Sequence, residues 1–540
     1  MKLYLVLVAL FFASQINGQH KSASRAASPK LVVGIVVDQM RWDFLERYGS
    51  RYGQGGFLKM RNNGFSCDQT YIPYLPTYTA PGHACVFTGS VPAINGIISN
   101  NWYSRELKRY VYCAEDTSVQ TVGSDSKAGM MSPVNMWTST VGDELRLSSN
   151  FRSKVIGIGL KDRGAILPAG HSANAAFWFD DANGSFITSS YYMKALPSWL
   201  QAFNARRLPD SLMKTAWNTL YPIKSYVQSS KDEAFYEAKL PGGGNTFPHV
   251  LDTISSNRSH TFRYLPYANT YTVSMAIAAI EGERLGQGGG TDMLTISFSQ
   301  PDYMGHTFGP NSIEAEDTYL RLDKDIADLL NYLDRKFGDD YLVFLTADHG
   351  VAHIPAFLKE NKIPAGTNSD KHLKALLNLK VEASTGLNKA VLNISNCQVY
   401  LDYDVVPLTK RSEVSRIIMQ VLLLEPTIGW VADLNNPADY RLVQDMQQRL
   451  LNGYNQKLSG DVQFIYKPGW FNGGSKGTTH GLWNPYDARI PLLWYGHGVR
   501  QGRSNKLVYM SDIAATVAAI LNIQVPNGNV GRVIEDVLLK

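Results

Sequence analysis

The sequence has few cysteines, few charged residues and no long apolar run after its first residues. Its four cysteines form no CxxC pair, so nothing indicates a zinc ribbon or a redox motif, and their pairing stays open: Cys67, Cys85, Cys113 and Cys397. Charged residues make up 18% of 540, the net charge is +5, and no basic run occurs, so we expect no nucleic-acid partner. No later stretch reaches the roughly 20 apolar residues of a spanning helix, so we expect no membrane anchor.

The first residues have the pattern of an export signal. Lys2 precedes an apolar run from Leu3 to Ala13, and small and polar residues follow. This arrangement predicts a secretory signal peptide, residues 1–18, that is cleaved after Gly18. No cysteine follows closely enough to carry a lipid. We therefore expect a mature protein that is free in the periplasm or secreted.

Behind the signal and a polar linker at 19–30, the chain alternates apolar strand-like runs with helical periodicity. Continuous apolar runs that suit buried parallel strands occur at 31–40, 293–302, 341–350 and 490–498. Between the second and third runs, apolar residues from Tyr319 to Leu333 recur at helical spacing. The alternation predicts an α/β fold over 31–540, with a mostly parallel central sheet flanked by helices.

Two stretches depart from this alternation, at about 172–265 and about 355–475. They are richer in proline, glycine, asparagine and aromatic residues, and their periodicity is weaker. We interpret them as cap insertions on the core. Their role stays open.

Acidic residues follow three of the predicted strands. Asp38, Asp302 and Asp348 stand where the carboxyl ends of strands bring ligands together in open α/β sheets. A single aspartate in such a place is commonly a turn or helix cap. Three of them, two with a nearby histidine, favour a site.

The nearby histidines complete a possible metal site. His306 follows Asp302 in PDYMGH, His349 adjoins Asp348 in TADHG, and His480 lies in the flexible stretch GGSKGTTHG. Carboxylate oxygen and imidazole nitrogen are ligands that suit zinc, and two metals roughly 4 Å apart can clamp the oxygens of a phosphoryl displacement. His353 competes with His349, which we prefer because it adjoins Asp348. His83 has no neighbouring carboxylate in the sequence and is left out.

Thr79, in PTYTAPGHACVFTG at 76–89, has two possible roles. It stands just before a helix-compatible stretch, and Pro81 suits the first turn of a helix. On its own Thr79 is a helix cap. Beside metal ligands, a hydroxyl at a helix N-terminus is suited to attack a phosphate, so we predict a nucleophile.

These segments resemble the alkaline phosphatase superfamily, and within it the PafA-like bacterial phosphate monoesterases with a threonine nucleophile. The resemblance runs discontinuously over most of the mature chain, and the insertions match less clearly. It is carried, in order, by VDQMR, PTYTAPGHACVFTG, NGIISNNWY, LKDRGAILPAGH, PDYMGHTFGP, TADHG, TTHG and YMSDIAATVAAILNI.

The resemblance implies two zinc ions per chain and a phosphothreonine intermediate. One zinc would be bound by Asp302, His306 and His480, and the other by Asp38, Asp348 and His349 together with Thr79. It also implies that Asn100, rather than its neighbour Asn101, donates to a phosphate oxygen; a turn residue is the alternative. We expect small-molecule phosphate monoesters as substrates, and a monomer.

Lys161 and Arg163, in LKDRG, are the residues that distinguish a monoesterase from a diesterase. Two residues apart in an extended segment, they would point the same way and converge on one dianion, whereas a solvated loop pair is the alternative. In the resemblance this pair belongs to monoesterases and is missing from the related diesterases, and the lysine supplies charge where classical alkaline phosphatases place magnesium.

Three other functions are alternatives to a phosphate monoesterase. A nucleotide pyrophosphatase/phosphodiesterase would share the metal ligands, Thr79 and Asn100. A sulfatase would need cysteine or serine where Thr79 stands. A zinc-dependent binding protein would tolerate loss of the nucleophile, yet every expected catalytic position is filled. The sequence favours an alkaline phosphatase.

Overall fold

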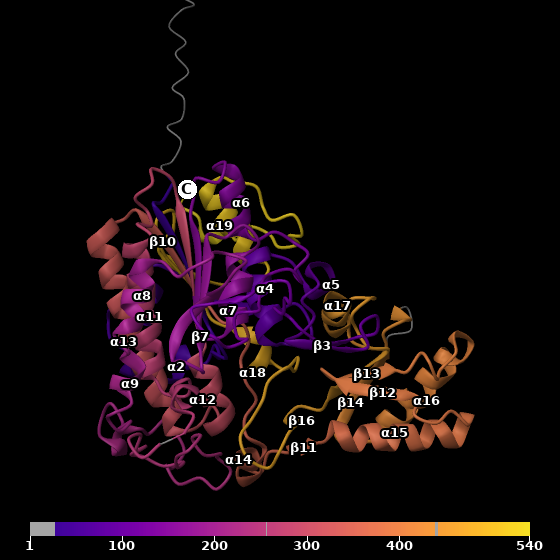
Figure 1. The fold of residues 1–540 in the computed structure, drawn as a ribbon. Helices are drawn as coiled ribbons and strands as arrows, with labels where there is room; N and C mark the ends of the chain where they lie inside the picture. The colour runs from indigo at the N-terminus through magenta and orange to yellow at the C-terminus, as the bar shows by residue number, and fades with distance from the viewer. Residues whose placement is uncertain (1–27, 255, 438–440, 540) are drawn as a thin grey trace, which may run out of the picture.

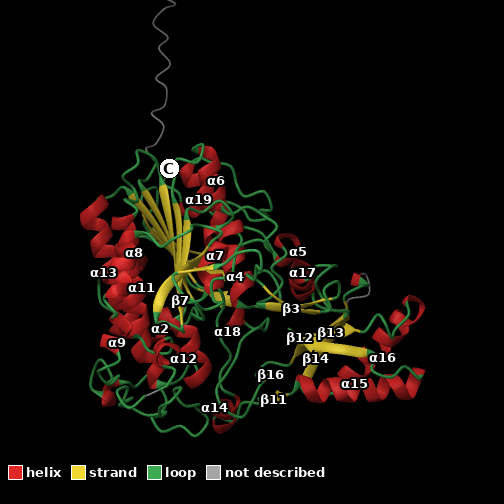
Figure 2. Cartoon of the chain, in the orientation of Figure 1, coloured by secondary structure: helices red, strands yellow, loops and turns green. Residues whose placement is uncertain are grey.

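The structure is a computed structural model that describes residues 28–254, 256–437 and 441–539. The predicted signal peptide and most of the predicted linker lie outside the described residues. An eleven-stranded sheet runs through the body, with helices on both faces (Figures 1 and 2). The predicted fold class, an α/β chain with a central sheet flanked by helices, is confirmed.

The centre of the sheet is parallel, and its margins are antiparallel except for β19, which pairs in parallel with β2. Strand β1 (Leu31–Val37) pairs in parallel with β9 (Asp292–Phe298) and β10 (Tyr341–Thr346). In spatial order the main path is β17 (Arg489–Ile490), β2 (Phe65–Tyr71), β18 (Leu492–Gly496), β10, β1, β9, β6 (Val155–Gly159), β7 (Ala175–Asp180), β8 (Ser185–Ser189) and β5 (Thr121–Val122), and β19 (Gly502–Tyr509) pairs with β2.

Two expectations about the strands need correction. The apolar run at 490–498 forms β18, but β18 runs antiparallel to β10. A strand that is covered on both faces is apolar in either direction, so the run cannot tell the direction. The predicted insertion at about 172–265 also begins inside the sheet, because β7 and β8 belong to it.

Helices pack on both faces of the sheet. One group packs on one face around α4 (Thr79–Thr88) and α7 (Asp162–Ala169), and another around α13 (Ile313–Phe337) on the other (Figure 1). The first group also contains α6 (Val141–Ser148) and α19 (Asp512–Leu521). The second group also contains α8 (Ser198–Ala205), α11 (Tyr267–Gly282) and α12 (Gln300–Phe308). Shorter helices are α2 (Phe44–Arg47), α3 (Phe57–Asn63), α5 (Pro92–Asn95), α9 (Leu208–Leu212), α10 (Arg258–Phe262), α14 (Pro355–Glu360) and α18 (Pro485–Ala488).

The helix predicted from Tyr319 to Leu333 is the middle of α13, whose ends follow from its sequence. At the N-terminus the Ser312 side chain accepts a hydrogen bond from Ala315 N at 3.1 Å. Glutamates lie in the first turn and basic residues in the last, as the helix dipole favours. The helix ends at Gly338, whose φ of 60° is a conformation that glycine adopts without strain.

Residues 366–437 and 441–472 form a separate lobe beside the body (Figures 1 and 2). A four-stranded sheet and two helices enclose a core of their own, which includes Leu377, Val399, Ile418 and Phe464. Its elements are β11 (Gly366–Asn368), α15 (Asp370–Thr385), β12 (Val391–Ser395), β13 (Gln398–Leu401), α16 (Arg411–Leu424), β14 (Ile428–Asp433), α17 (Gln444–Gly453), β15 (Val462–Tyr466) and β16 (Trp470–Asn472). The lobe faces the hairpin of β3 (Asn101–Ser104) and β4 (Arg109–Tyr112).

Two further observations bear on the sequence predictions. All four cysteines are free thiols in the described part of the chain, and three of them are buried. Among the described residues, no helix has both the length and the apolar character that crossing a membrane requires.

Candidate active site

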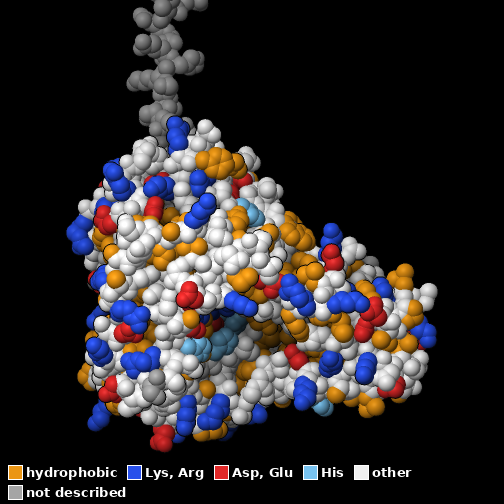
Figure 3. All heavy atoms as spheres, viewed as in Figure 1, with side chains coloured by type: hydrophobic (Ala, Val, Ile, Leu, Met, Phe, Trp, Pro, Cys, Tyr) orange, Lys and Arg blue, Asp and Glu red, His pale blue; other side chains and the backbone are white. Residues whose placement is uncertain are grey.

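The predicted site residues meet at the carboxyl ends of the central strands. Asp38 directly follows β1, Asp348 and His349 lie in the loop after β10, and Asp302 lies in the first turn of α12 after β9. Figure 3 shows histidine side chains on the floor of a hollow between the body and the lobe. The parallel register of β9, β1 and β10 therefore brings together residues that are far apart in the sequence.

Asp38, Asp348 and His349 form the first group. Each is fully buried, and their ligand atoms all lie within 4.8 Å of one another. His349 Nε2 lies 3.5 Å from Asp38 Oδ1 and 3.5 Å from Asp348 Oδ2. The structure thus groups the three residues of one predicted ligand set.

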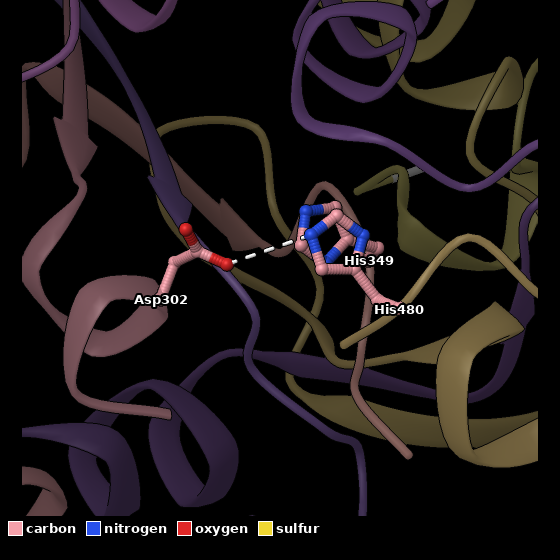
Figure 4. Close-up of side chains that lie close together, drawn as sticks. All are labelled: Asp302, His349 and His480. Carbon is pink, nitrogen blue, oxygen red and sulfur yellow. Dashed lines mark ion pairs between the residues drawn. The ribbon is translucent and has the colours of Figure 1, made fainter. Parts of the chain in front are cut away.

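Asp302 is the centre of the second group. Its Oδ1 lies 3.1 Å from His306 Nε2 and 3.6 Å from His480 Nε2. The tighter cluster around Asp302 contains His480 and His349, which Figure 4 shows facing the carboxylate. The two imidazole rings stack with centroids 3.5 Å apart and planes 12° apart. His349 therefore lies between the two groups.

Backbone carbonyls orient the three imidazoles in the same way. The Nδ1 atoms of His306, His349 and His480 lie 2.8, 2.9 and 2.8 Å from the carbonyl oxygens of Thr478, Gly350 and Thr77. An Nδ1–H that donates to a carbonyl leaves the Nε2 lone pair free, which is the usual arrangement of a histidine that binds a metal. In each case Nε2 faces Asp302 or Asp38.

The carboxylates of the first group fit a bound cation. Asp38 Oδ1 and Asp348 Oδ2 are buried and accept no hydrogen bond within the described residues. Burial and the negative charge of Asp348 raise the pKa of Asp38 well above its ordinary value. A buried oxygen without a partner is costly unless a cation compensates it, so these residues fit a metal.

His480 has the protonation that a metal ligand needs. Burial and the neighbouring imidazole of His349 hold the pKa of His480 well below its ordinary value. Burial also lowers the pKa of His349. Both rings are therefore neutral near pH 7, the form in which imidazole binds metals.

Lys161 lies between the two groups. Its Nζ is 2.5 Å from Asp38 Oδ2 and 2.5 Å from Asp302 Oδ2, and the side chain is almost fully buried. Burial acts to lower the pKa of Lys161, but the charges of Asp302 and Asp38 outweigh it and raise that pKa. A permanent positive charge is thus fixed beside both candidate metal groups.

Lys161 is extended, with φ of −87° and ψ of 133°, but the expectation that it shares one extended segment with Arg163 is wrong. Lys161 is the N-cap of α7, and Arg163 lies in the first turn of that helix. The alternating geometry of a strand therefore does not apply. Arg163 instead points its NH1 to Tyr112 Oη at 3.1 Å, and its buried Nε has no partner among the described residues.

Thr79 is the first residue of α4, and its hydroxyl does not cap the helix. The N-cap residue is Tyr78, which makes no side-chain cap bond. Thr79 Oγ1 lies 3.3 Å from His349 Nε2. The hydroxyl therefore faces the metal-ligand groups, as the nucleophile prediction requires.

Asn100, which lies outside α4, caps the N-terminus of that helix. Its Oδ1 accepts a hydrogen bond from Ala80 N at 2.8 Å. Asn101, the alternative, is exposed and begins β3. The structure thus places Asn100 beside Thr79 and Asn101 outside the site.

Two glycines allow α4 and α12 to approach the site. A Cβ on Gly82 would meet the backbone oxygen of Asp348 at 2.5 Å, and one on Gly305 would meet Gln39 Oε1 at 1.8 Å. Only glycine permits these distances. The close approach sets the distance from Thr79 to the ligand loop.

Sequence reasoning missed Gln39. Its Nε2 donates to Asp302 Oδ1 at 2.5 Å, and its backbone N–H donates to Asp348 Oδ1 at 3.1 Å. Gln39 has a φ of 67°, a conformation that is rare for a residue with a side chain. One strained residue thus holds carboxylates of both groups. Its place beside Asp38 in VDQMR was the only sequence signal.

His83, which the sequence analysis left out of the ligand sets, lies beside the site. It is fully buried, and its Nδ1 lies 2.9 Å from Thr79 O and 3.3 Å from Asp348 Oδ2. Its carboxylate partner is 265 positions away in the chain, so no local pattern could indicate it. His353, the competitor of His349, instead contacts Arg41 and Asn311.

The comparisons with known proteins agree with this architecture. The profile of the family "Type I phosphodiesterase / nucleotide pyrophosphatase" matches residues 32–488. The alkaline phosphatase PhoV of Synechococcus elongatus is 48% identical, over 99% of each chain. The alkaline phosphatase PafA of Elizabethkingia meningoseptica is 46% identical, over 98% of each chain. The chain belongs to the type I phosphodiesterase / nucleotide pyrophosphatase family and, within it, to the PafA-like alkaline phosphatases.

The solved structure of PafA has the same fold. Wild-type PafA matches with a TM-score of 0.92 at 47% identity, covering 95% of this chain and 100% of PafA. A second PafA structure is a variant in which a threonine is replaced by serine, and an asparagine, a lysine and an arginine by alanine; the lysine and arginine are two positions apart.

Proposed function

We propose that this enzyme is an exported zinc-dependent alkaline phosphatase that hydrolyses small phosphate monoesters to alcohol and inorganic phosphate through a phosphothreonine at Thr79. The observation that carries the proposal is the position of Thr79 Oγ1, 3.3 Å from His349 Nε2 at the start of α4. Its relatives PhoV and PafA are named alkaline phosphatases, which supports the reaction class.

Two zinc ions would be held by the buried carboxylate and imidazole groups. Asp38, Asp348 and His349 with Thr79 would hold one, and Asp302, His306 and His480 the other. Zinc suits this set of oxygen and nitrogen donors, and when bound it supplies Lewis acidity to the oxygens that attack and leave. Asp38 Oδ1 and Asp348 Oδ2, which accept no hydrogen bond among the described residues, support the fit.

The residues of the chain position the reacting groups. Thr79 Oγ1 loses its proton and forms a bond to phosphorus while the ester P–O bond breaks; the leaving oxygen takes the electron pair and gains a proton, which gives the alcohol. Water then attacks the phosphothreonine, which releases inorganic phosphate and restores the threonine hydroxyl. Thr79 lies at the N-terminus of α4, where the positive end of the helix dipole favours the negative charge of the phosphoryl group.

Asn100, Lys161 and Arg163 would recognise the transferred phosphoryl group. Asn100 Oδ1 accepts a hydrogen bond from Ala80 N, so the amino group of Asn100 is left to donate to a phosphate oxygen. Arg163 has an unpaired buried Nε, and Lys161 carries a fixed charge. The threonine, asparagine, lysine and arginine replaced in the PafA variant are the same four residue types, with the same spacing of two between lysine and arginine.

A phosphodiesterase is the second candidate, because the matching family includes phosphodiesterases by its description. The substrates of the two activities differ in the charge that they present to Lys161 and Arg163. A monoester dianion presents a charged oxygen to these cations. In a diester, that oxygen carries an uncharged substituent. The basic pair therefore favours the monoesterase.

The test compares matched substrates. We expect kcat/KM for an aryl phosphate monoester to exceed that for the corresponding diester. The Lys161→Ala, Arg163→Ala double variant should lose several powers of ten on the monoester, at roughly 1.5–3 kcal/mol per charge-assisted contact, and much less on the diester. An equal loss on both substrates would contradict the assignment. Metal analysis of both proteins controls for loss of zinc.

Zinc dependence, export and the monomeric state have separate tests. Exhaustive chelation should abolish hydrolysis, zinc should restore it, and metal analysis should return two zinc ions per chain; activity in metal-free protein would contradict the ligand assignment. The N-terminal residue of the protein recovered from the periplasm or medium should be Gln19 if the signal peptide is 1–18. Light scattering should give the mass of one chain.

A further inference from the structure

One contact between the lobe and the body is made by the turn of the β12–β13 hairpin. Asn396 and Cys397 form the two-residue loop between Ser395 and Gln398, which pair across the hairpin. Their φ values are 56° and 57°, so both are left-handed, as in a type I′ turn. The Gln463 side chain donates to Cys397 O at 2.8 Å, so the turn is held in place from inside the lobe.

Asn396 uses both ends of its amide on the body. Ser99 Oγ donates to Asn396 Oδ1 at 2.8 Å, and Asn396 Nδ2 donates to Asn101 O at 2.9 Å. Both partners are neighbours of Asn100, one on each side. Nearly 300 positions separate these residues, so the contact is a product of the fold.

Asn100 itself is fixed at two points by the body. Its backbone oxygen accepts from Cys113 N at 3.0 Å, and its Oδ1 accepts from Ala80 N at 2.8 Å. These bonds define where its amino group points, but Asn100 is the last residue of the connection between α5 and β3 rather than part of a regular element. Asn396 adds a contact to the residue on each side of Asn100.

We propose that Asn396 is a positioning residue that acts through Asn100. By clamping Ser99 and Asn101, it fixes the direction of the Asn100 amide toward the transferred phosphoryl group, and it makes the lobe a working part of the active site. This inference rests on the proposed role of Asn100 in phosphate recognition. Asn396 itself does not touch the reacting atoms.

The direct test is Asn396→Gly. Glycine keeps the left-handed turn without strain and removes both hydrogen bonds. We expect kcat/KM for a phosphate monoester to fall about 10- to 100-fold, since a misplacement of about 1 Å in a site can cost about 10²-fold. Inhibition by inorganic phosphate should weaken in parallel. Ser99→Ala, which removes one of the two bonds without altering the turn, should give a smaller loss in the same direction.

The matched control is Asp404→Asn. Asp404 lies in the lobe and pairs with Lys108 of the β3–β4 hairpin at 2.5 Å, a contact between the same two parts that does not flank Asn100. Wild-type kinetics are expected for this variant. A loss equal to that of Asn396→Gly would mean that the whole interface matters rather than the bridge, and would overturn the proposal.

The decisive arm combines Asn396→Gly with Asn100→Ala. If Asn396 acts through Asn100, the double variant should be no slower than Asn100→Ala alone; multiplied losses would overturn the positioning role. If Asn100→Ala lost activity and Asn396→Gly did not, only this inference would be overturned. An unimpaired Asn100→Ala would remove the proposed role of Asn100 and the inference with it.

Discussion

The ammonium of Lys161 lies 2.5 Å from a carboxylate oxygen of Asp302, deep in the site. The same ammonium lies 2.5 Å from Asp38, so one cation joins the carboxylates of both candidate metal groups. Without it, two buried carboxylates would face each other with less compensating charge. The contact therefore bears on stability as well as on recognition of phosphate.

Replacement of Lys161 by methionine should destabilise the metal-free protein. Breaking a buried ion pair leaves uncompensated charge and costs about 3–5 kcal/mol in the free energy of unfolding. The measurement is denaturant unfolding of chelated wild type and Lys161→Met. Lys154→Met is the control, because Lys154 is 40% exposed and pairs with Glu283 near the surface, where a pair contributes about 1 kcal/mol or less. Equal effects of the two substitutions would contradict the prediction.

Gln39→Gly should weaken zinc binding although it relieves backbone strain. Glycine accepts the φ of 67°, but the hydrogen bond to Asp302 Oδ1 is lost. Removing a partner that orients a metal ligand typically costs about 10- to 100-fold in affinity. Competition with a chromogenic chelator gives the affinity. If zinc bound as tightly as in the wild type, Gln39 would be only a turn residue.

Asp325→Asn should stabilise the protein at neutral and alkaline pH. Burial and the neighbouring Asp328 raise the pKa of Asp325 to about 7, from 3.8, and its Oδ2 has no partner among the described residues. A raised acid pKa means that folding disfavours the charged form, so stability is lost as pH rises from about 4 to about 7 and then levels off. With 1.36 kcal/mol per pKa unit, the penalty is at most about 4 kcal/mol.

Urea unfolding of wild type and Asp325→Asn across this pH range provides the check. The difference in unfolding free energy should grow from pH 4 to pH 7 in favour of the variant and stay constant above. A difference that does not change with pH would show that Asp325 titrates normally. Asp325 lies on α13 and belongs to neither proposed ligand set, so activity should be unchanged.

The sequence was informative where one segment decides its own structure. The apolar runs predicted β1, β9 and β10, and the aspartates that follow them predicted the edge of the sheet where the site lies. The helical spacing from Tyr319 predicted α13. In each case a periodic pattern or a local end of an element carries the information.

The sequence was silent where distant segments meet. The contacts of His83 with Asp348, of Gln39 with Asp302 and of Asn396 with Ser99 span more than 250 positions each. Lys161 lies beside both candidate metal groups, but the segment that holds Lys161 and Arg163 begins a helix, because Asp162 and the residues after it suit a first turn. Local propensity was misjudged there, whereas the other contacts depend on the fold.

Thr79→Ala should lose several orders of magnitude in rate and keep its metal, because only the nucleophile is removed. Thr79→Ser should retain part of the activity, since a hydroxyl remains at the start of α4. Metal analysis of all three proteins separates loss of the nucleophile from loss of zinc.

The most direct measurement is acid quenching of the enzyme during turnover of a phosphate monoester, followed by mass spectrometry of the peptide that contains residues 76–89. The account predicts a phosphoryl group on Thr79 that is absent without substrate and absent from Thr79→Ala. Near wild-type turnover by Thr79→Ala, with no phosphorylated peptide in the wild type, would contradict the central claim and return Thr79 to a structural role at the start of its helix.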